Sequence, residues 1–480
     1  MDQEQLERDV ASYVDEVWED VIADIDTLVS HASIANAQPA EPGAPFGRPV
    51  REALDCALGI AQKLGYRTSD DEGYVGMCDI PGEEAQQLAT ICHVDVVPAG
   101  PGWSTDPFKM ERRDGWLLGR GVIDDKGPAV LSLYAGAYLI KRGITPRYAF
   151  RALLGCDEEV GMSDIHHYLE GHAQPAFLFT PDAEFPVCNA EKGQLGATFY
   201  SKKIDGGRIL SWSGAEATNA IPSQSICVLD IDPSELPSPI EHGDRIDISE
   251  TENGHARIFA RGIGGHASMP EGTINAIGLV IDYLREAEDS FAARDARLLT
   301  PEEHEFVKFL AFVHADTAGR GLGIDAESAA FGPLTCNAGT ICVRDGRIEQ
   351  TIDVRFPDST SAEAMETQLE PLVGRFGVTL AVDHAKEPFS VSADDQTVRA
   401  LIDTYNEFTG RQAKPFAMGG GTYARNFDRA VSFGPEEPGC ELPAWGGQMH
   451  GPNECASEEL LKQALKIYIV AILRLNELDL

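Results

Sequence analysis

The hydrophobic positions of the first 190 residues follow two periods in turn, one typical of helices and one of buried strands. Apolar side chains recur every three to four positions over 4–30, as in an amphipathic helix, and further helices are predicted over 50–64 and 127–142. The second and third of these segments end at Gly65 and Gly143, which are typical helix stop residues. Short apolar runs typical of buried strands cover 88–97, 148–155 and 176–180. Strands that alternate with helices predict an α/β domain.

The pattern changes after residue 194. Strands are expected at 256–263 and 377–385, and a hairpin at 335–357 that turns at Asp345–Gly346. Helices are expected at 275–287 and 361–375. This β-α-β-β-α-β order indicates a ferredoxin-like unit. Residues 288–334 match no pattern in detail, and we expect a helical insert there.

The last part of the chain returns to the first style and ends in a predicted helix, 457–477. The simplest organisation is one α/β domain that is interrupted by an α+β domain. We therefore predict a discontinuous domain of residues 1–194 and 386–480, with a mixed, mostly parallel sheet and helices on both faces. The inserted ferredoxin-like domain is predicted to span residues 195–385.

Composition narrows the class of partner. The 480 residues include 39 Lys and Arg against 77 Asp and Glu, a formal charge of −38. Nucleic acids and anionic membranes need a basic surface, so this balance argues against both partners. The ten cysteines form no C-x-x-C pair, and the N-terminal segment is acidic rather than basic and then apolar. We expect reduced thiols and a cytoplasmic protein without a membrane-spanning helix.

Metal-binding residue types gather where the predicted strands end. A strand period of two puts His93 and Asp95 on one face. Because parallel strands end at one edge of a sheet, side chains at several strand ends can form a single site. The candidates are His93, Asp95, Asp124, Glu158, Glu159, Asp182 and, in a late loop, His450. Two imidazoles and several carboxylates suit one or two Zn²⁺, Mn²⁺ or Co²⁺ ions.

Each motif has an ordinary structural explanation when it is taken alone. The acidic pair in DDKG (124–127) is typical of a helix N-terminus. The run DEE (157–159) is typical of a solvated loop. The candidates gain weight only because all of them fall at the same predicted edge.

In combination the motifs resemble the M20 family of metallopeptidases. The series is H-V-D, G-R-G-x-x-D-D-K-G, D-E-E-x-G, P-D and M-H-G-x-x-E, over about residues 85–455. Among its members, the long bacterial dipeptidases of the PepV type are the most similar. That likeness lies in TPDAEFPV (180–187), NAEKG (189–193) and GGGTYAR (419–425).

The resemblance implies two divalent metal ions, zinc first, with manganese or cobalt as alternatives. It assigns His93 and Asp182 to one ion, Glu159 and His450 to the other, and Asp124 to both. It makes Glu158 the general base, and Asp95 the residue that orients His93.

The resemblance also assigns residues to the substrate. His266 would polarise the substrate carbonyl, and Asn219 and Arg355 would contact the substrate. Arg355 can pair with a carboxylate through two parallel hydrogen bonds, and the backbone of Gly420, Gly421 and Thr422 can donate to the same anion. The implied activity is hydrolysis of dipeptides that carry a free C-terminal carboxylate.

Two other functions stay open on the same fold. An N-acyl-amino-acid deacylase or desuccinylase would also bind a carboxylate beside an amide. A non-enzymatic binding protein would be indicated by loss of Glu158 or of a metal ligand, and all of these are present. The inserted segment is about twice the length of one ferredoxin-like unit, so we expect a monomer in which His266 acts within its own chain.

Overall fold

The computed structural model describes residues 3–480, and within that range it contains nine α-helices. The chain divides into two compact units. The first unit consists of Met1–Ala190, Ser390–Phe416 and Gly421–Leu480. The second unit consists of Glu191–Phe389 and Ala417–Gly420. The inserted unit therefore begins at 191 and ends at 389, where the sequence led us to expect 195 and 385. The short segment Ala417–Gly420 also belongs to it, which the sequence did not predict.

The first unit is built on a nine-stranded sheet. Its order is β1-β2-β6-β3-β7-β24-β9-β22, with β23 paired to β9. The strands are β1 (Arg67–Asp71), β2 (Val75–Ile80), β3 (Glu84–His93), β6 (Tyr148–Gly155), β7 (Phe177–Thr180), β9 (Cys188–Glu191), β22 (Phe389–Ser390), β23 (Phe416–Met418) and β24 (Ala430–Ser432). Smaller sheets join β4 (Glu111–Arg113), β5 (Trp116–Leu118) and β26 (Cys455–Ser457), and β8 (Ala183–Glu184) with β25 (Pro435–Glu436).

The centre of this sheet is parallel and its margins are antiparallel. Strand β3 pairs in parallel with β6 and β7, and β24 pairs in parallel with β7. At the margins, β1 with β2, β2 with β6 and β24 with β9 are antiparallel. Strands β3, β6 and β7 consequently end at the same edge, and the segments that follow them emerge there.

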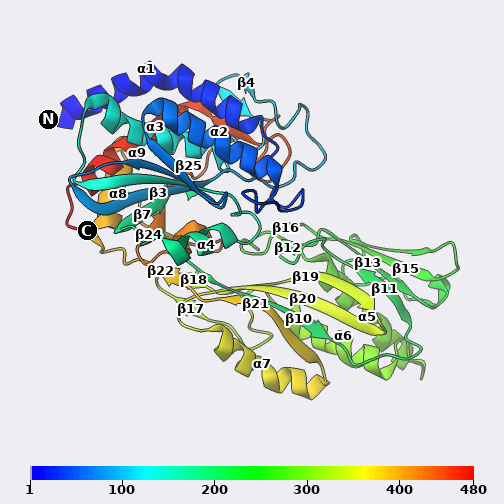
Figure 1. The fold of residues 1–480 in the computed structure, drawn as a ribbon. Helices are drawn as coiled ribbons and strands as arrows, with labels where there is room; N and C mark the ends of the chain where they lie inside the picture. The colour runs from blue at the N-terminus through cyan, green and yellow to red at the C-terminus, as the bar shows by residue number, and fades with distance from the viewer. Residues whose placement is uncertain (1–2) are drawn as a thin grey trace. The chain divides into compact units, whose positions relative to one another are not determined.

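Helices cover this sheet on two sides. They are α1 (Gln3–Val29), α2 (Arg48–Leu64), α3 (Lys126–Arg142), α4 (Ser163–Gly171), α8 (Gln396–Thr409) and α9 (Glu458–Leu475). Figure 1 shows α1 and α2 above the strands and α4 below them. The predicted ends of α2 and α3 are confirmed, because Gly65 and Gly143 adopt the left-handed conformation that closes a helix.

The second unit contains two four-stranded antiparallel sheets. One has the order β19-β20-β10-β21, from β10 (Gly193–Tyr200), β19 (Thr335–Arg344), β20 (Arg347–Phe356) and β21 (Thr379–Lys386). The other has the order β11-β13-β15-β14, from β11 (Ile209–Ser213), β13 (Gln224–Leu229), β14 (Ile246–Glu250) and β15 (Ala256–Arg261). Short pairs join β12 (Ala220–Ile221) with β16 (Gly265–His266), and β17 (Glu327–Ser328) with β18 (Gly332–Pro333).

The prediction of the first strand of the β-α-β-β-α-β unit is wrong. Segment 256–263 forms β15, which belongs to the other sheet, and β10 pairs with both β20 and β21 instead. Periodicity identifies a strand but not its neighbour, because pairing depends on residues distant in sequence. The hairpin turn at Asp345–Gly346 is confirmed: both residues have positive φ, 51° and 72°.

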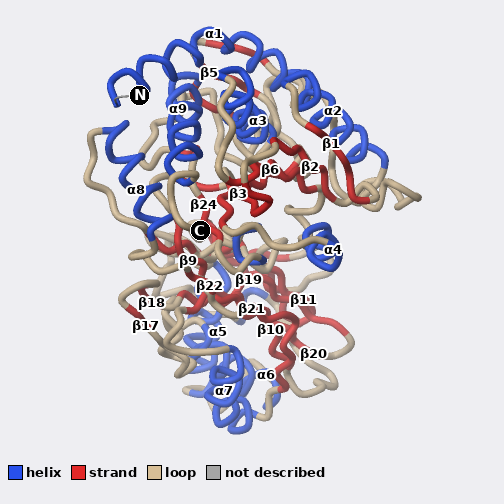
Figure 2. The backbone as a smooth tube through the Cα atoms, turned by 60° about the vertical axis from the view of Figure 1, so that its left-hand side comes forward, coloured by secondary structure: helices blue, strands red, loops and turns tan. Residues whose placement is uncertain are grey.

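Three helices complete the second unit: α5 (Ala276–Ala292), α6 (Pro301–Val313) and α7 (Ala362–Phe376). Figure 2 shows them together on one side of the strands β10, β20 and β21. Helix α6 lies in the segment 288–334 that sequence patterns left undefined. It starts with a capping box between Thr300 and Glu303, and its Phe306, Phe309 and Leu310 lie in the core.

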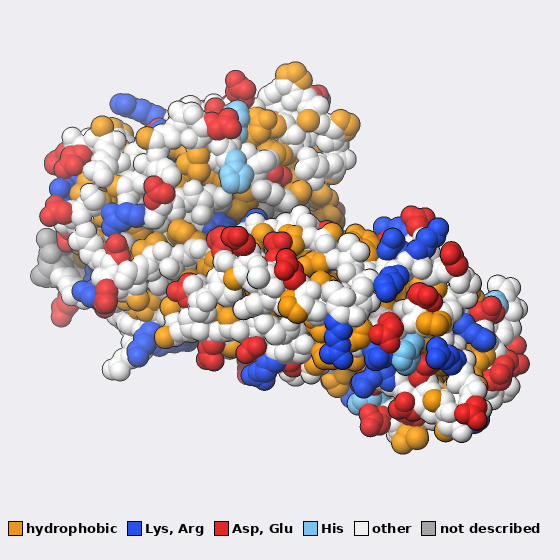
Figure 3. All heavy atoms as spheres, turned by 90° about the horizontal axis from the view of Figure 1, so that it is seen from below, with side chains coloured by type: hydrophobic (Ala, Val, Ile, Leu, Met, Phe, Trp, Pro, Cys, Tyr) orange, Lys and Arg blue, Asp and Glu red, His pale blue; other side chains and the backbone are white. Residues whose placement is uncertain are grey.

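The surface reflects the acidic composition. On the face shown in Figure 3, acidic side chains are spread widely and basic side chains lie among them. Within residues 3–480, no helix is both long and apolar enough to cross a membrane.

Candidate metal centre and active site

His93 lies at the end of β3 and is fully buried. Its Nδ1 is 2.9 Å from the backbone oxygen of Asp95 and 3.4 Å from the Asp95 carboxylate. A carbonyl oxygen only accepts hydrogen bonds, so Nδ1 carries the proton and donates. The lone pair of the ring therefore sits on Nε2, which is the arrangement of a metal-binding histidine.

Asp124 lies between two histidines and presents one carboxylate oxygen to each. Its Oδ1 is 3.0 Å from His93 Nε2, and its Oδ2 is 2.8 Å from His450 Nε2. Burial raises the pKa of Asp124, but hydrogen bonds from His450 and His93 outweigh burial and hold it below its usual range. A buried carboxylate with two oppositely directed oxygens suits a ligand shared by two cations.

Each histidine also faces a second carboxylate. Asp182 Oδ2 is 3.8 Å from His93 Nε2, and Glu159 Oε2 is 3.1 Å from His450 Nε2. Burial raises the pKa of Asp182 to about 7. The hydrogen bonds to Asp124 and Glu159 raise the pKa of His450 to about 11. The shift of His450 reflects the negative charge that Asp124 and Glu159 concentrate beside its ring.

Glu158 and Glu159 lie on the loop that follows β6. Asp95 holds this loop from one side, because its carboxylate accepts hydrogen bonds from the backbone N–H groups of Glu158 (3.3 Å) and Glu159 (3.2 Å). Burial raises the pKa of Glu158 well above its usual value, and the charge of Asp182 adds to the shift. A carboxyl with a raised pKa is suited to accept and return a proton near neutral pH.

The donor set fits divalent metal ions. Ligand atoms lie within 4.8 Å of one another in two groups, His93 with Asp124 and Glu159, and His93 with Asp125 and Asp182. Within residues 3–480, the buried Glu159 Oε1 and Asp125 Oδ1 have no hydrogen-bond partner. Buried carboxylate oxygens without a donor are costly, and a cation would satisfy them.

Asp125 is a member of this cluster for which the sequence predicted a place beside Asp124 but no role. It is fully buried, and its Oδ2 accepts a hydrogen bond of 3.0 Å from the backbone N–H of His93. This contact fixes the end of β3, on which His93 stands. The neighbouring position in DDKG was the only signal for it.

The substrate candidates His266 and Asn219 lie side by side in the second unit. Strand β16 pairs with β12, and the Ala267 N–H donates to the Asn219 oxygen at 2.8 Å. The His266 Nδ1 is 2.7 Å from the Ser268 hydroxyl, and the side chains of His266 and Asn219 are exposed. The sequence placed these two residues 47 positions apart in chain order without a predicted contact between them.

Arg355 lies in the same unit and is buried. Its Nε and Nη2 donate to the two oxygens of Asp353 at 2.7 and 2.9 Å, and its Nη1 donates to the Gly419 oxygen at 3.1 Å. Asp353 therefore accepts the pair of parallel hydrogen bonds from Arg355 that we expected a substrate carboxylate to accept. Gly419 packs closely against the segment that carries His266. A Cβ atom added at Gly419 would lie only 2.7 Å from Ser268 Cβ.

Along the chain, the boundary between the two units falls within the GGGT segment. Gly420 belongs to the second unit, and Gly421 and Thr422 belong to the first. The Thr422 hydroxyl accepts a hydrogen bond from the Ala424 N–H at 3.1 Å and caps the short helix η2 (Tyr423–Asn426). Its side chain thus has a structural role in addition to any contact made by its backbone.

The chain matches the family model described as Peptidase family M20/M25/M40 over residues 89–474. The protein belongs to this peptidase family. It is accordingly an enzyme that hydrolyses peptide bonds.

Relatives within the family cover nearly the whole chain. The Beta-Ala-Xaa dipeptidase of Lactobacillus delbrueckii subsp. lactis is 31% identical over 469 residues, 95% of this chain and 96% of the relative. Two solved structures share the fold. Human carnosine dipeptidase 1 covers 98% of this chain and 99% of its own, with 15% identity and a TM-score of 0.59. The aminoacylhistidine dipeptidase of Vibrio alginolyticus covers 94% and 96%, with 14% identity and a TM-score of 0.56.

The family motifs contain a buried ion pair that sequence reasoning did not single out. Arg120 comes from G-R-G and Glu454 from M-H-G-x-x-E, and their Nη1 and Oε2 atoms are 2.6 Å apart. The other Glu454 oxygen accepts from the N–H groups of Gly121 and Ile123 at 3.0 and 3.1 Å. Arg120 Nη2 donates to the backbone oxygen of His450 at 3.2 Å. The pair thus joins the Asp124 segment to the His450 loop.

A further residue that sequence reasoning missed, Asp164, shapes the loop of Glu158 and Glu159. It is fully buried, and one of its oxygens accepts from the backbone N–H groups of Cys156 (2.6 Å) and Asp157 (3.1 Å). The Tyr423 hydroxyl donates to the same oxygen. Acidic residues are common in the first turn of a helix, so the position of Asp164 in α4 gave no separate signal in the sequence.

Proposed function

We propose that this peptidase is a dinuclear metallo-dipeptidase that cleaves dipeptides with a free C-terminal carboxylate. The observation that carries the proposal is the position of Asp124, whose two oxygens face His93 and His450 at 3.0 and 2.8 Å. A single shared carboxylate between two histidine–carboxylate pairs is the donor arrangement that two adjacent divalent ions require.

The ligands in this proposal are those expected from the sequence. His93 and Asp182 would hold one ion, Glu159 and His450 the other, and Asp124 both. When bound, the ions supply Lewis acidity and lower the pKa of a water molecule. Histidine and carboxylate donors accept several divalent ions, and we propose zinc first, with manganese or cobalt as alternatives.

We assign the proton transfers to Glu158. Its carboxyl takes a proton from the attacking water and returns that proton to the leaving amine, so that it ends the cycle as it began. The raised pKa of Glu158 supports this role, because a carboxyl at its ordinary pKa would release the proton too readily. Asp95 orients two parts of the site at once, the ring of His93 and the loop of Glu158.

The substrate-binding roles rest on the second unit. We propose that His266 polarises the substrate carbonyl and that Asn219 contacts the substrate beside it. The contact between their strands supports a joint role. Arg355 would bind the terminal carboxylate with Nη1, together with backbone N–H groups of Gly420, Gly421 and Thr422, because Asp353 already holds its Nε and Nη2.

A dipeptide substrate is supported by the names of the relatives, which are a Beta-Ala-Xaa dipeptidase and two other dipeptidases. We propose an active monomer without an obligate partner. We also propose a cytoplasmic location, because no disulfide joins the cysteines within residues 3–480 and a reducing compartment keeps thiols reduced.

A substrate panel with defined metals tests this function. Protein stripped with a chelator should not hydrolyse dipeptides, and Zn²⁺, Mn²⁺ or Co²⁺ should restore the activity. The panel should contain each dipeptide beside its N-acetyl and N-succinyl forms and its C-terminal amide. Full activity without metal would contradict the dinuclear site, and preference for the acylated compounds would indicate a deacylase or desuccinylase instead.

A further inference from the structure

Ser268 makes two contacts with the ring of His266. Its hydroxyl oxygen lies 2.7 Å from His266 Nδ1, and its backbone N–H donates a hydrogen bond of 3.2 Å to the same nitrogen. The Met269 N–H donates to the His266 backbone oxygen at 3.1 Å and closes the turn that brings serine and histidine together. The Nδ1 atom of His266 is therefore held by its own segment of the chain.

The backbone contact decides which ring nitrogen of His266 carries the proton. A backbone N–H can only donate, so Nδ1 accepts and bears no proton of its own. The Ser268 hydroxyl can donate or accept, and beside an unprotonated Nδ1 it donates. In the neutral ring the proton is consequently on Nε2. His93 has the opposite arrangement, with its proton on Nδ1, because it faces a carbonyl oxygen there. The two histidines thus differ as a hydrogen-bond donor and a metal ligand should.

Gly419 positions the Ser268 side chain from the other side. A Cβ atom added at Gly419 would lie 2.7 Å from Ser268 Cβ and 3.4 Å from its Oγ, so a larger residue there would displace the serine. The Gly419 oxygen accepts from Arg355 Nη1 at 3.1 Å, and the other donors of Arg355 are fixed on Asp353. One series of contacts within the second unit therefore leads from Arg355 to the ring of His266.

We propose that Ser268 is a positioning residue that fixes His266 as the Nε2–H tautomer and so makes Nε2 the donor to the substrate carbonyl. The inference rests on the proposed role of His266 and deepens it by naming the atom that donates. His266 lends a hydrogen bond and keeps its proton, so the proton transfers stay with Glu158. Gly419 contributes by leaving space for Ser268.

Steady-state kinetics of the zinc-loaded protein, with the best dipeptide of the substrate panel, tests the positioning role. Ser268→Ala should lower kcat about three- to tenfold at nearly constant KM, because the lost hydrogen bond orients a group that acts in the transition state. Ser268→Thr and Ser268→Val have the same shape and differ in the hydroxyl, so a steric effect is common to both. The Thr variant should have the higher kcat. Ser249→Ala, at an exposed serine of β14, is the control and should leave kcat unchanged.

A double substitution tests whether Ser268 acts through His266. Ser268→Ala should have no further effect on kcat in the His266→Ala background. The same fold loss in both backgrounds would overturn the proposal, since Ser268 would then act independently. Normal kcat in His266→Ala would refute the proposed role of His266 and this inference with it. A low kcat in His266→Ala beside an unchanged kcat in Ser268→Ala would overturn the positioning role alone.

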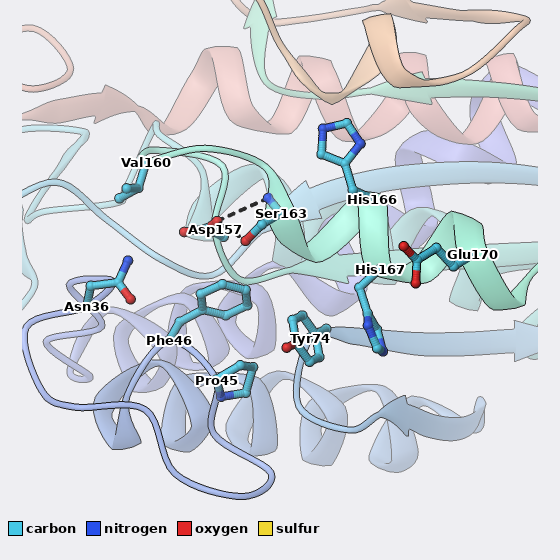
Figure 4. A pocket seen from close by; sticks show the side chains of 10 residues that line it. All are labelled: Asn36, Pro45, Phe46, Tyr74, Asp157, Val160, Ser163, His166, His167 and Glu170. Carbon is cyan, nitrogen blue, oxygen red and sulfur yellow. Dashed lines mark hydrogen bonds between the residues drawn. The ribbon is translucent and has the colours of Figure 1, made fainter.

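Nitrogen NMR of zinc-loaded protein with isotope-labelled histidines reads the tautomer independently of activity. His266→Gln identifies the His266 resonances among those of the 12 histidines. We expect a protonated Nε2 and an unprotonated Nδ1, and Ser268→Ala should shift the Nδ1 resonance. Figure 4 shows the matched control, Ser163, whose hydroxyl donates to Asp157 in the first unit. Ser163→Ala should leave the Nδ1 resonance of His266 in place. A proton on Nδ1, or an Nδ1 resonance that does not move in Ser268→Ala, would contradict the proposal.

Discussion

Arg120 and Glu454, 334 positions apart in the chain, form a fully buried ion pair with a separation of 2.6 Å between Nη1 and Oε2. Through its other oxygen, Glu454 holds the backbone N–H groups that precede Asp124, and Arg120 holds the backbone oxygen of His450. Two proposed metal ligands that are distant in the chain, Asp124 and His450, are therefore positioned by one contact.

Glu454→Gln should lower both stability and metal affinity. The substitution leaves the Arg120 guanidinium buried without its anion, which typically costs about 3–5 kcal/mol. Urea unfolding of the metal-free protein should show that loss, and Co²⁺ titration followed by absorption should show weaker binding. Glu4→Gln breaks the exposed Arg8–Glu4 pair and should shift neither measurement. Unchanged Co²⁺ affinity in Glu454→Gln would contradict the positioning role.

Glu158 and Glu159 should respond differently to the same substitution. Glu158→Gln removes the proton acceptor and should lower kcat about 10²- to 10⁴-fold while metal content is retained. Glu159→Gln should lose metal as well, because Glu159 Oε2 faces His450. Metal analysis and steady-state kinetics on the two variants separate the roles, and near-normal kcat in Glu158→Gln would disprove the base assignment.

Arg355→Lys should raise KM for free-acid dipeptides although the charge is kept. Lysine cannot keep the paired contacts with Asp353 while it also presents a donor in the direction of Nη1. C-terminally amidated dipeptides should be poor substrates for the unmodified enzyme. Equal kcat/KM for acid and amide forms would remove the carboxylate role of Arg355.

His266→Ala should lower kcat about 10²- to 10³-fold, as loss of a carbonyl-polarising donor does, without loss of metal. Mixing His266→Ala with Glu158→Gln tests whether the histidine acts in its own chain. We expect the mixture to stay inactive. Activity regained on mixing would mean that subunits share the histidine, and the monomer proposal would fail.

His314 should make the second unit sensitive to acid. Burial lowers the pKa of this imidazole to about 4, although its contact with Gln350 acts in the other direction. The unfolded chain binds the proton near pH 6.5, so stability present above that pH is lost as the pH falls toward 4. Between pH 7.5 and 5.0 the loss should be about 2 kcal/mol. His314→Gln should reduce this pH dependence in urea unfolding, and the exposed control His242→Gln should not.

Helices and strands with a strong local pattern were predicted well. The helix expected at 127–142 is α3, and the hairpin expected to turn at Asp345–Gly346 joins β19 to β20. These elements depend on spacing within a few residues, which the sequence displays directly. Helix α6 was missed as a defined element, although its capping box at Thr300 and Glu303 and its apolar residues Phe306 and Leu310 are signals present in the sequence.

The sequence by itself determined the family and the candidate metal ligands, because each ligand stands at a strand end or in a motif whose spacing is local. Tertiary structure alone decided which residues meet. It selected β10 instead of β15 as the partner of β20 and β21, placed Asp353 on Arg355, and joined Arg120 to Glu454. The physical reason is that burial and pairing are fixed by side chains that are distant in the chain. The local spacing of hydrophobic residues does not show which buried charges form ion pairs or which strands pair with each other.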